Sequence, residues 1–406
     1  MNWMLAVKTV AIALSIPAVA AAQAFRAIEL GTLPARPATP VATDINNRGQ
    51  VVGVAGGEVF VWELATGIRS LAIAADNVLI NNAGIIVGTR FVSGSSQLFA
   101  WVDGVVSNLP GPPESTWILR GLTDNGIVLV CGARCWGVYA GAVYDLDLLA
   151  GAAIFAVNEA ATLGGALGTD AYLRFWDGRV IIPWGAATFP ETPGPGTVEL
   201  IGAGGHFAGR SGQRAWYGMP DGSAFPTGLA APARGGFGLR DINRRGDVVG
   251  LLRAHNLLPQ LDTAFLYADG RLIDLSAAVV SGPNEIRDAL AINDERHIVA
   301  AATIEGVRRS VVLVPDVPAP PSALSFSVDG RVVTLTWAPS AGAQDYVVEA
   351  GSVSGASDLY NTAVGALPSL VTPAPPGRYY VRVRARNASG VSAPSNEVII
   401  EIRESH

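Results

Sequence analysis

The chain has 406 residues, of which half are apolar and 15% are charged, and its formal net charge is −6. That length suffices for two or three domains, and the weak negative charge excludes a nucleic-acid-binding protein that relies on a basic surface. The only lysine is Lys8, which lies in a predicted leader. The mature chain therefore lacks the amine that Schiff-base catalysis and P-loop phosphate binding require.

Residues 1–24 have the features of a secretory signal peptide. Lys8 supplies a positive charge, residues 9–20 are apolar, and Ala22-Gln23-Ala24 offers a small-x-small cleavage site before Phe25. The apolar run is short for a membrane-spanning helix, and an uncleaved anchor is the alternative. We therefore predict export to the periplasm or the extracellular space, with no transmembrane segment in the mature chain.

A nine-residue pattern, Ile-Asn-x-x-Gly-x-Val-Val-Gly, recurs seven times in the following part of the chain. Its clearest copies begin at Ile45, Ile80 and Ile242. Weaker copies begin at Leu122, Val157, Ile201 and Ile292. Each copy is followed by an aromatic segment, a turn such as Asp-Gly and a short last strand. Four short strands at this spacing are typical of a propeller blade, which must stack on its neighbours because one such sheet cannot bury both faces.

The residue types indicate how one unit folds. Ile-Asn and the following glycine form a turn, in which the glycine accommodates a positive φ angle. Val-Val-Gly begins the second strand, the aromatic segment is the third, and Asp-Gly leads into the fourth. Four tryptophans recur in the aromatic segments, and we expect them to pack between sheets rather than to stack on a sugar. They are Trp62, Trp101, Trp176 and Trp216.

The seventh unit lacks a fourth strand, because residues 310–314 run directly into Pro315. Residues 27–30 look like a last strand with no unit before it. We therefore predict that this N-terminal strand completes the seventh sheet and closes the ring, which hides both sheet edges. The prediction is an all-β, seven-bladed, propeller-like domain over residues 25–315. An open β-solenoid or two separate sheets are the alternatives.

The repeat is similar to the HAF repeat of exported bacterial proteins, in its Ala/Val-Phe-x-Trp segment and its Asp-Gly turn. The resemblance covers residues 25–315 and is strongest in the first, second and sixth units. The histidine that names the repeat is missing here, and Thr263-Ala264-Phe265 comes closest to it. The resemblance implies export and a blade-like fold, and it transfers no catalytic residue.

The only two cysteines, Cys131 and Cys135, flank Gly132-Ala133-Arg134. Apolar residues on both sides predict two strands joined by a three-residue turn, whose facing residues are close enough for a disulfide. Export supplies the oxidising compartment that a structural disulfide needs. Free thiols are the alternative, and neither a histidine nor a third cysteine accompanies the pair to suggest a metal or redox role.

The histidines differ in the strength of their functional signal. His206 and His297 both occupy the sixth position of the nine-residue pattern, where other copies carry Gln, Ile, Thr or Asp, so we interpret that position as a variable strand site. His255 lies in a long insertion, residues 253–262. Long loops on rigid scaffolds often carry binding function. We therefore name three residues as candidates in binding loops, namely Glu191, His255 and Asp262.

The acidic residues allow two chemical hypotheses. Different sheets could bring distant carboxylates together for glycoside hydrolysis, the candidates being Glu191, Asp247, Asp262 and Glu285. Asp44-Ile45-Asn46 and Asp241-Ile242-Asn243 resemble the start of a calcium loop, but calcium needs six or more converging oxygens, and an Asx turn explains the same residues. We predict no catalytic residue, no cofactor and no metal site.

The composition changes at Asp316, and residues 316–321 form a predicted stiff, proline-rich linker. Residues 322–406 then alternate as strands do. This segment resembles a fibronectin type III domain, in which Tyr379 matches the tyrosine-corner position.

Period-two alternation points three residues of one strand inward, namely Val381, Val383 and Ala385. Arg382 and Arg384 share the opposite face, where we expect a solvated surface rather than an anion site.

These features favour an exported, monomeric binding protein without catalytic activity, which presents its propeller loops to a glycan, a peptide or an envelope partner. A polysaccharide-active hydrolase or lyase is the first alternative, and a structural envelope protein is the second. A central pocket with two or more converging carboxylates and an arginine would favour the enzyme. A pocket lined only by backbone and apolar groups would exclude it.

Overall fold

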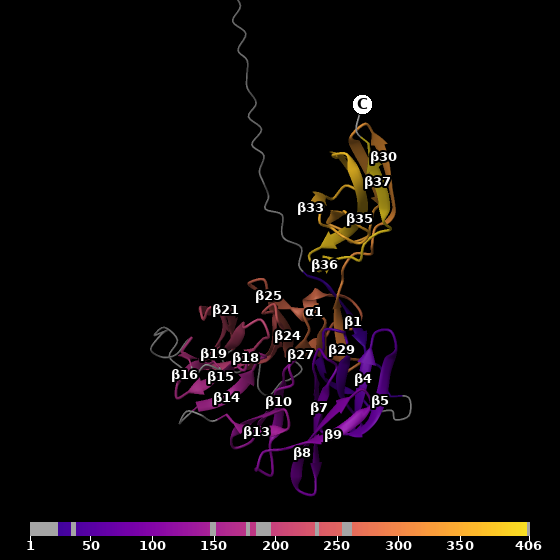
Figure 1. The fold of residues 1–406 in the computed structure, drawn as a ribbon. Helices are drawn as coiled ribbons and strands as arrows, with labels where there is room; N and C mark the ends of the chain where they lie inside the picture. The colour runs from indigo at the N-terminus through magenta and orange to yellow at the C-terminus, as the bar shows by residue number, and fades with distance from the viewer. Residues whose placement is uncertain are drawn as a thin grey trace, which may run out of the picture. The chain divides into compact units, whose positions relative to one another are not determined.

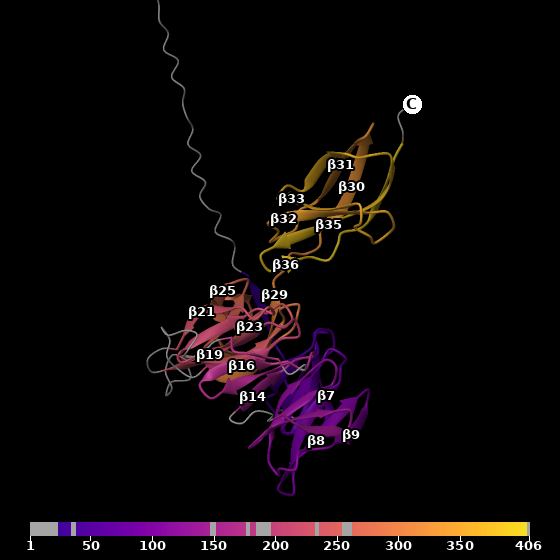
Figure 2. The same ribbon diagram turned by 60° about the vertical axis from the view of Figure 1, so that its left-hand side comes forward.

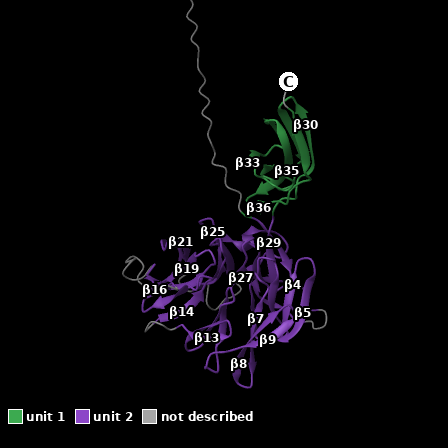
Figure 3. Cartoon of the chain, viewed as in Figure 1, with its two compact units in different colours: residues 1–23, 317–406 green, residues 24–316 purple. Residues whose placement is uncertain are grey.

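The computed structural model describes residues 23–33, 38–146, 152–175, 179–183, 196–231, 235–253 and 262–403. The chain divides into two compact units, residues 24–316 in one and residues 1–23 and 317–406 in the other (Figure 3). The predicted signal peptide lies outside the described residues except at Gln23 and Ala24. No helix in the described ranges is long and apolar enough to cross a membrane.

The unit of residues 24–316 is built from strands, with one helical turn, α1 (Leu275–Ala278). Its described strands form seven sheets, which we number in chain order (Figure 1). Sheet 1 contains β2 (Val41–Ile45), β3 (Val51–Ala55), β4 (Glu58–Glu63) and β5 (Gly67–Ala74). Sheet 2 contains β6 (Asn77–Ile80), β7 (Ile86–Val92), β8 (Ser95–Val102) and β9 (Val105–Leu109). Sheet 3 contains β10 (Ile118–Leu122), β11 (Val128–Cys131), β12 (Cys135–Tyr139) and β13 (Ala142–Asp145).

The remaining four sheets repeat this order of strands. Sheet 4 contains β14 (Ala152–Val157), β15 (Leu163–Leu167), β16 (Asp170–Arg174) and β17 (Val180–Ile181). Sheet 5 contains β18 (Gly196–Ile201), β19 (Phe207–Ser211), β20 (Arg214–Gly218) and β21 (Ala224–Ala230). Sheet 6 contains β22 (Gly236–Ile242), β23 (Val248–Arg253), β24 (Thr263–Ala268) and β25 (Arg271–Asp274). Sheet 7 contains β27 (Ile286–Ile292), β28 (Ile298–Ile304), β29 (Val307–Pro315), β1 (Phe25–Glu29) and β26 (Val279–Ser281).

The first strands of these sheets contact one another in circular order. β2 contacts β6, and the contacts continue through β10, β14, β18 and β22 to β27, which in turn contacts β2. Figure 2 shows the same sheets from a second direction. The unit is therefore all-β and propeller-like, with its four-stranded sheets stacked side by side.

Sheet 7 contains the N-terminal strand. β1 pairs antiparallel with β29, where Phe25 faces Pro315, so the predicted pairing of the N-terminal strand with the last sheet is confirmed. β26 adds a fifth strand, which pairs parallel with β1 and which the sequence pattern did not predict.

Seven hydrophobic clusters lie between neighbouring sheets of the described chain, one at each interface. The cluster that joins sheet 7 to sheet 1 packs Val299 and Val312 against Val51 and Phe60. All four side chains are almost fully buried. Because burying a side chain of this size contributes roughly 2 kcal/mol, the stacking of sheets stabilises a unit that no single sheet could stabilise.

The two glycines of the nine-residue pattern have different structural roles. Those at the fifth position, such as Gly49 with a φ angle of 75°, adopt the positive φ that we predicted. The ninth glycine lies beneath an aromatic ring of the third strand. A Cβ atom on Gly53 would be 2.7 Å from the ring of Phe60, and one on Gly88 would be 2.3 Å from that of Phe99. The ninth glycine and the facing aromatic residue therefore recur together.

The tryptophans do not share one structural position. Trp62 and Trp101 face the seventh residue of the nine-residue pattern, whereas Trp216 faces the ninth, Gly209. The expectation that they recur at one point of the unit is therefore wrong for Trp216. Trp62 and Trp216 are buried in clusters between sheets, and Trp176 lies outside the described residues.

Cys131 and Cys135 are joined by a disulfide, with Cα atoms 4.1 Å apart. They end β11 and begin β12, which confirms the predicted hairpin with a three-residue turn. Both cysteines are buried and pack against Ile154 and Tyr172 of sheet 4. The disulfide therefore lies at the interface between sheets 3 and 4.

The second unit packs two sheets around one core. One sheet contains β30 (Ser322–Asp329), β31 (Val332–Ala338) and β34 (Ser369–Pro373). The other contains β33 (Tyr360–Gly365), β32 (Asp345–Gly351), β35 (Gly377–Asn387) and β36 (Gly390–Val391), and β37 (Val398–Ile402) also pairs with β35. Residues 316–321 contain neither helix nor strand.

Side chains of β35 follow the predicted alternation on one face and depart from it on the other. The inward residues Val381 and Val383 are buried as predicted. Arg382 and Arg384 do not form a solvated face, because their guanidinium groups donate to the two oxygens of Glu349 at 3.0 and 2.8 Å. That expectation is wrong, since β32 places the buried Glu349 directly opposite Arg382.

Candidate functional site

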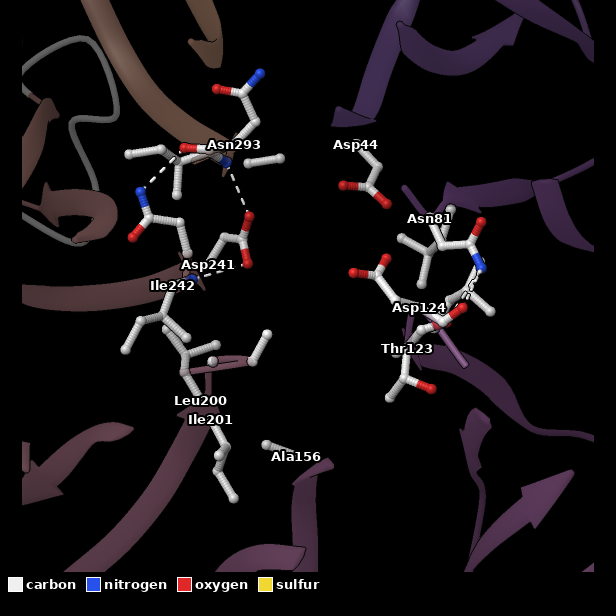
Figure 4. Close-up of a pocket in the computed structure, with 18 of the residues that line it drawn as sticks. Asp44, Asn81, Thr123, Asp124, Ala156, Leu200, Ile201, Asp241, Ile242 and Asn293 are labelled. Atoms are coloured by element: carbon white, nitrogen blue, oxygen red, sulfur yellow. Dashed lines mark hydrogen bonds between the residues drawn. The ribbon is translucent and has the colours of Figure 1, made fainter. Parts of the chain in front are cut away.

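A cavity of about 270 Å³ lies where the first strands of the seven sheets meet. Every sheet contributes lining residues from the end of its first strand and from the turn that follows. Figure 4 shows ten of these residues, among them Asp44, Asp124 and Asp241, whose carboxyl groups all lie at the cavity. The first residue of each pattern copy, which is isoleucine in five copies, leucine in one and valine in one, packs in a cluster between neighbouring sheets, so the residues next to it face the cavity.

A β-bulge shapes the wall of this central cavity in six of the seven sheets. The register of the first strand shifts two residues before the pattern's first residue, so that one residue has no partner on the second strand. Such a bulge re-aims the side chain of the extra residue. The six bulged residues all line the cavity, and they are Thr43, Arg120, Phe155, Glu199, Arg240 and Leu290.

Some bulged residues form ion pairs with neighbouring side chains, and others do not. Arg240 donates to both carboxylate oxygens of the buried Asp288, at 3.1 and 3.0 Å. Glu199 pairs with Arg210 of β19. Arg120 is exposed and Phe155 is 37% exposed. Arg120 and Phe155 are therefore the exposed bulged residues whose side chains form no hydrogen bond or ion pair within the described part of the chain.

Two aspartates of the wall cross-link neighbouring sheets. Asp44 Oδ1 accepts the N–H of Ile45 at 2.8 Å, and its Oδ2 accepts the N–H of Ile80 in sheet 2 at 2.9 Å. Asp241 accepts in the same way from Ile242 and from Ile292 in sheet 7. The expected Asx turn is present at the asparagine of each segment, because Asn46 and Asn243 accept the N–H group two residues on, and it is absent at Asp44 and Asp241. The cavity holds the carboxylates and arginines expected of an enzyme. Each carboxylate oxygen of Asp44 and Asp241 accepts a backbone N–H group, whereas Glu159 Oε2 is buried without a hydrogen-bond partner among the described residues.

The surroundings of these aspartates favour their protonated form. Both side chains are half-buried and line the cavity. This burial, together with the charge of Asp241, raises the pKa of Asp44 to about 8, against the opposing effect of its two backbone hydrogen bonds. Burial likewise raises the pKa of Asp241 to about 6.

The asparagine of the nine-residue pattern links the sheets into a ring. Asn46 Oδ1 accepts the N–H groups of Arg48 and Gln50, which closes the turn, and its Nδ2 donates to the carbonyl of Asn81 in the next sheet at 3.1 Å. Asn243 donates likewise to Asn293, and Asn293 donates to Asn46 at 3.0 Å, which joins the last sheet to the first. We call these contacts the asparagine ring.

Sheets 3 and 5 interrupt the asparagine ring, because Thr123 and Gly202 stand where the asparagine would be. In sheet 3 the Thr123 hydroxyl bonds only within its own turn. Sheet 5 has no side chain at this place. The backbone of the next sheet approaches closely instead: a Cβ atom on Gly204 would be 2.0 Å from the carbonyl oxygen of Arg244. Gly202 and Gly204 thus serve close packing between sheets, in agreement with our rejection of a dinucleotide loop here.

The residues predicted from the sequence do not gather at one site. Glu191 and His255 lie outside the described residues. Asp262 is 7% exposed and lies 3.8 Å from the guanidinium group of Arg253, so it is a buried residue at the base of the loop. Glu285 lies directly before β27 and pairs with Arg287 of that strand.

Asp247, the remaining acidic candidate, lines a second cavity together with His206, which we interpret from the sequence only as a variable strand residue. His297 is half-buried, and burial lowers its pKa.

No family model and no curated protein sequence matches the chain. Among solved structures, a Fn3-like protein from Clostridium thermocellum is 26% identical over 22% of this chain and 97% of its own, with a TM-score of 0.19. The fn3 domain of the human collagen alpha-1(XX) chain is 28% identical over 22% of this chain and 88% of its own, also with a TM-score of 0.19. The WD40 repeats of RRP9 are 11% identical over 72% of this chain and 99% of their own, with a TM-score of 0.45. These likenesses carry no functional conclusion.

The bulged residues are the part of the site that sequence reasoning missed. Their signal is a position two residues before six of the seven pattern copies. There the side chain is Thr, Arg, Phe, Glu or Leu, while the residue before it is always apolar. Such variability in an otherwise regular strand is what a cavity-facing position would show. Only the strand register identifies it as a bulge.

Proposed function

We propose that the protein is an exported binding protein without catalytic activity, in which a seven-bladed propeller of the HAF-repeat type precedes a fibronectin type III module. The circular contacts of the first strands and the N-terminal strand in sheet 7 support the closed ring. The hydrogen bond from the Tyr379 hydroxyl to the Pro375 carbonyl, 2.8 Å long, supports the fibronectin assignment, because that bond defines a tyrosine corner.

The six bulged residues carry the proposal of binding. One cavity receives a hydroxyl group, two guanidinium groups, an aromatic ring, a carboxylate and an aliphatic side chain, each from a different sheet. A rigid ring that places varied side chains around one cavity suits recognition of a ligand, because few of them must be ordered on binding. The ligand class that we propose is a glycan or a peptide.

The hydrogen bonds of the aspartates support the absence of catalysis. A general base or nucleophile needs a lone pair directed at the substrate. Each oxygen of Asp44 and of Asp241 already accepts one backbone N–H group, which occupies one of its two lone pairs and fixes the carboxyl group against the wall. Their role in the proposal is to satisfy inward-facing backbone groups of neighbouring sheets.

Binding is tested with the mature chain, residues 25–406, on a glycan array and against a random peptide library. Phe155→Ala and Arg120→Ala should each weaken the captured ligand at least about tenfold, as the loss of one stacked or charge-assisted contact predicts. Phe91→Ala is the matched control, since Phe91 is 59% exposed in sheet 2 and does not line the cavity. Failure to bind either library, together with no turnover of polysaccharides, would refute the proposal in favour of a structural envelope protein.

A second candidate function is hydrolysis of a polysaccharide. The observation in its favour is that Asp44 and Asp241 line one cavity with pKa values of about 8 and about 6, and a protonated carboxyl group beside an ionisable one can act as an acid and base pair. Release of reducing ends from a polysaccharide panel, abolished by Asp44→Asn and unchanged in Phe91→Ala, would establish it. Turnover that Asp44→Asn leaves intact would exclude this pair.

A further inference from the structure

A second cavity of about 270 Å³ lies between sheets 5 and 6, beside the first turn of sheet 7. We call it the lateral pocket. It shares no lining residue with the central cavity. Its walls come from β20, β21 and β24 and from the turns of the sixth and seventh pattern copies. All of them belong to the unit of residues 24–316, so the stacking of sheets fixes the shape of the pocket.

One wall of the lateral pocket is aromatic. Tyr217 is the centre of this wall: the ring of His206 stacks on it at 27°, with the ring centroids 5.9 Å apart, and the rings of Phe225 and Tyr267 tilt against it at 5.4 Å. Tyr217 and Tyr267 are buried, whereas Phe225 is 38% exposed. The buried tyrosines therefore form a fixed base, and Phe225 offers an accessible aromatic ring.

The other wall is a network of opposite charges. Arg296 donates from Nε and Nη2 to the two carboxylate oxygens of Asp247, both at 2.8 Å, and its Nη2 also donates to Asp269 at 2.9 Å. Arg245 lies 3.7 Å from Asp247 and is half exposed. Two carboxylates and two guanidinium groups balance, so this wall provides hydrogen-bond donors and acceptors without a net charge.

The charged wall departs from the repeat at a cost in stability. Arg296 occupies the fifth position of the seventh pattern copy, where glycine is usual, and it keeps the positive φ angle of 63°. A non-glycine residue in that region carries backbone strain. The Arg296 and Asp247 side chains are also buried, and a buried ion pair rarely stabilises more than an apolar replacement would.

The first two pattern copies show the less costly solution at the equivalent place. There Gly84 stands where Arg296 stands, and the neutral Gln50 stands where Asp247 stands. Gln50 accepts from Asn46 at 2.9 Å, as Asp247 accepts from Asn243. Arg48 and Glu63 lie near this place, but they form no buried ion pair there. Because the fold can close this interface without a buried ion pair, we infer that the pair of Arg296 and Asp247 serves a function other than closure.

The aromatic wall has unused hydrogen-bonding capacity. No hydrogen bond within the described residues engages the hydroxyl group of Tyr217 or of Tyr267. Burial raises the pKa of Tyr217 to about 12, so its hydroxyl stays protonated and can both donate and accept. His206 Nδ1 is buried without a hydrogen-bond partner, which is a further cost that packing alone does not require.

We propose that the lateral pocket binds one ring of a neutral saccharide. A pyranose has an apolar face of C–H groups, which matches the ring of Phe225, and a rim of hydroxyl groups, each a donor and an acceptor. The tyrosine hydroxyls and the charged network offer both kinds of partner. Because the charges of the pocket balance, an anionic or a cationic ligand is disfavoured. The volume of the lateral pocket is near the lower end of the range for ligand-binding pockets, which fits a single sugar ring.

The test uses the mature chain and five methyl glycosides, those of glucose, galactose, mannose, xylose and N-acetylglucosamine. Saturation-transfer NMR detects binding, and titration calorimetry measures the dissociation constant. Phe225→Ala removes the accessible ring, and Asp269→Asn removes one acceptor at the exposed edge of the network. We expect at least one glycoside to bind, with an affinity at least tenfold lower in each variant. Phe91→Ala should bind as the unaltered chain does, and circular dichroism confirms that the variants fold.

Failure of this proposal and failure of the central-cavity proposal are distinguishable. If no glycoside binds, or if binding is unchanged in Phe225→Ala, the lateral pocket is not a saccharide site, whatever the array and peptide library give. If Phe225→Ala abolishes glycoside binding while Phe155→Ala and Arg120→Ala leave it unchanged, the lateral pocket is a site of its own. If Phe155→Ala and Arg120→Ala weaken glycoside binding and Phe225→Ala does not, the central cavity is the site.

Discussion

Replacing Asn293 by alanine tests whether the asparagine ring holds the propeller-like unit closed. Asn293 is 3% exposed and makes three hydrogen bonds: its Nδ2 donates to the carbonyl of Asn46 at 3.0 Å, and its Oδ1 accepts the N–H groups of Glu295 and His297 at 3.1 and 2.8 Å. Alanine removes all three and leaves their partners without replacements. Each bond contributes about 1 kcal/mol, and each buried group left unsatisfied costs roughly 1–3 kcal/mol. We therefore expect Asn293→Ala to lower the free energy of unfolding by about 3–5 kcal/mol.

The assay is urea denaturation of the mature chain, followed by tryptophan fluorescence. Asn108→Ala is the matched control, because Asn108 accepts one exposed hydrogen bond from Arg90, and its loss should cost less than about 1 kcal/mol. Asn81→Ala removes an equivalent link between sheets 2 and 3 and should resemble Asn293→Ala. A cost for Asn293→Ala within 1 kcal/mol of that for Asn108→Ala would refute the closing role of the ring.

Three further predictions concern pH, charge and the disulfide. Because the pKa of Asp44 is higher in the folded than in the unfolded state, the folded state binds the proton more tightly. The free energy of unfolding should therefore fall by up to about 5 kcal/mol as pH rises from 4 to 8. Thermal denaturation at several pH values measures this fall, which Asp44→Asn should reduce. Arg296→Gly alone should destabilise by up to about 3–5 kcal/mol, because it breaks the buried ion pair and leaves Asp247 with only the half-exposed Arg245, 3.7 Å away, as a counter-charge. Adding Asp247→Gln should restore most of the loss, and a double-mutant cycle without coupling would contradict this. Replacing Cys131 and Cys135 by serine should lower stability by about 2 kcal/mol, as the short closed loop predicts, and reduction of the unaltered chain should give the same shift in denaturation midpoint.

The repeat made much of the fold predictable, because its residues act through local geometry. A glycine at positive φ and an Asp-Gly turn depend only on their own backbone, so the turns and strands follow from the pattern. The N-terminal strand in sheet 7 was predictable for a different reason: the seventh unit was one strand short. β26 left no such signal, and its parallel pairing with β1 arises only in the folded unit.

The candidate site was less predictable, because it depends on register and on contacts between distant strands. A bulge at Arg120 or Phe155 changes no residue type, so the sequence cannot distinguish it from a regular strand position. The role of Asp44 depends on the Ile80 N–H of another sheet, and the pairing of Arg382 with Glu349 depends on the register of β32 and β35. His206 shows the limit of the repeat argument: its position is variable, and it nevertheless lines a pocket.

The pairing of β1 with β29 has a consequence for folding during synthesis. The strand that is made first cannot find its partner until the last strand of the same unit has been made, because Phe25 faces Pro315. Until then, six sheets can stack in order while the seventh stays incomplete and both ends of the stack expose strand edges. Closing the ring brings together the most distant residues of the unit, and contacts of such long range form late and slowly. The unit is therefore most exposed to aggregation immediately before its final strand arrives.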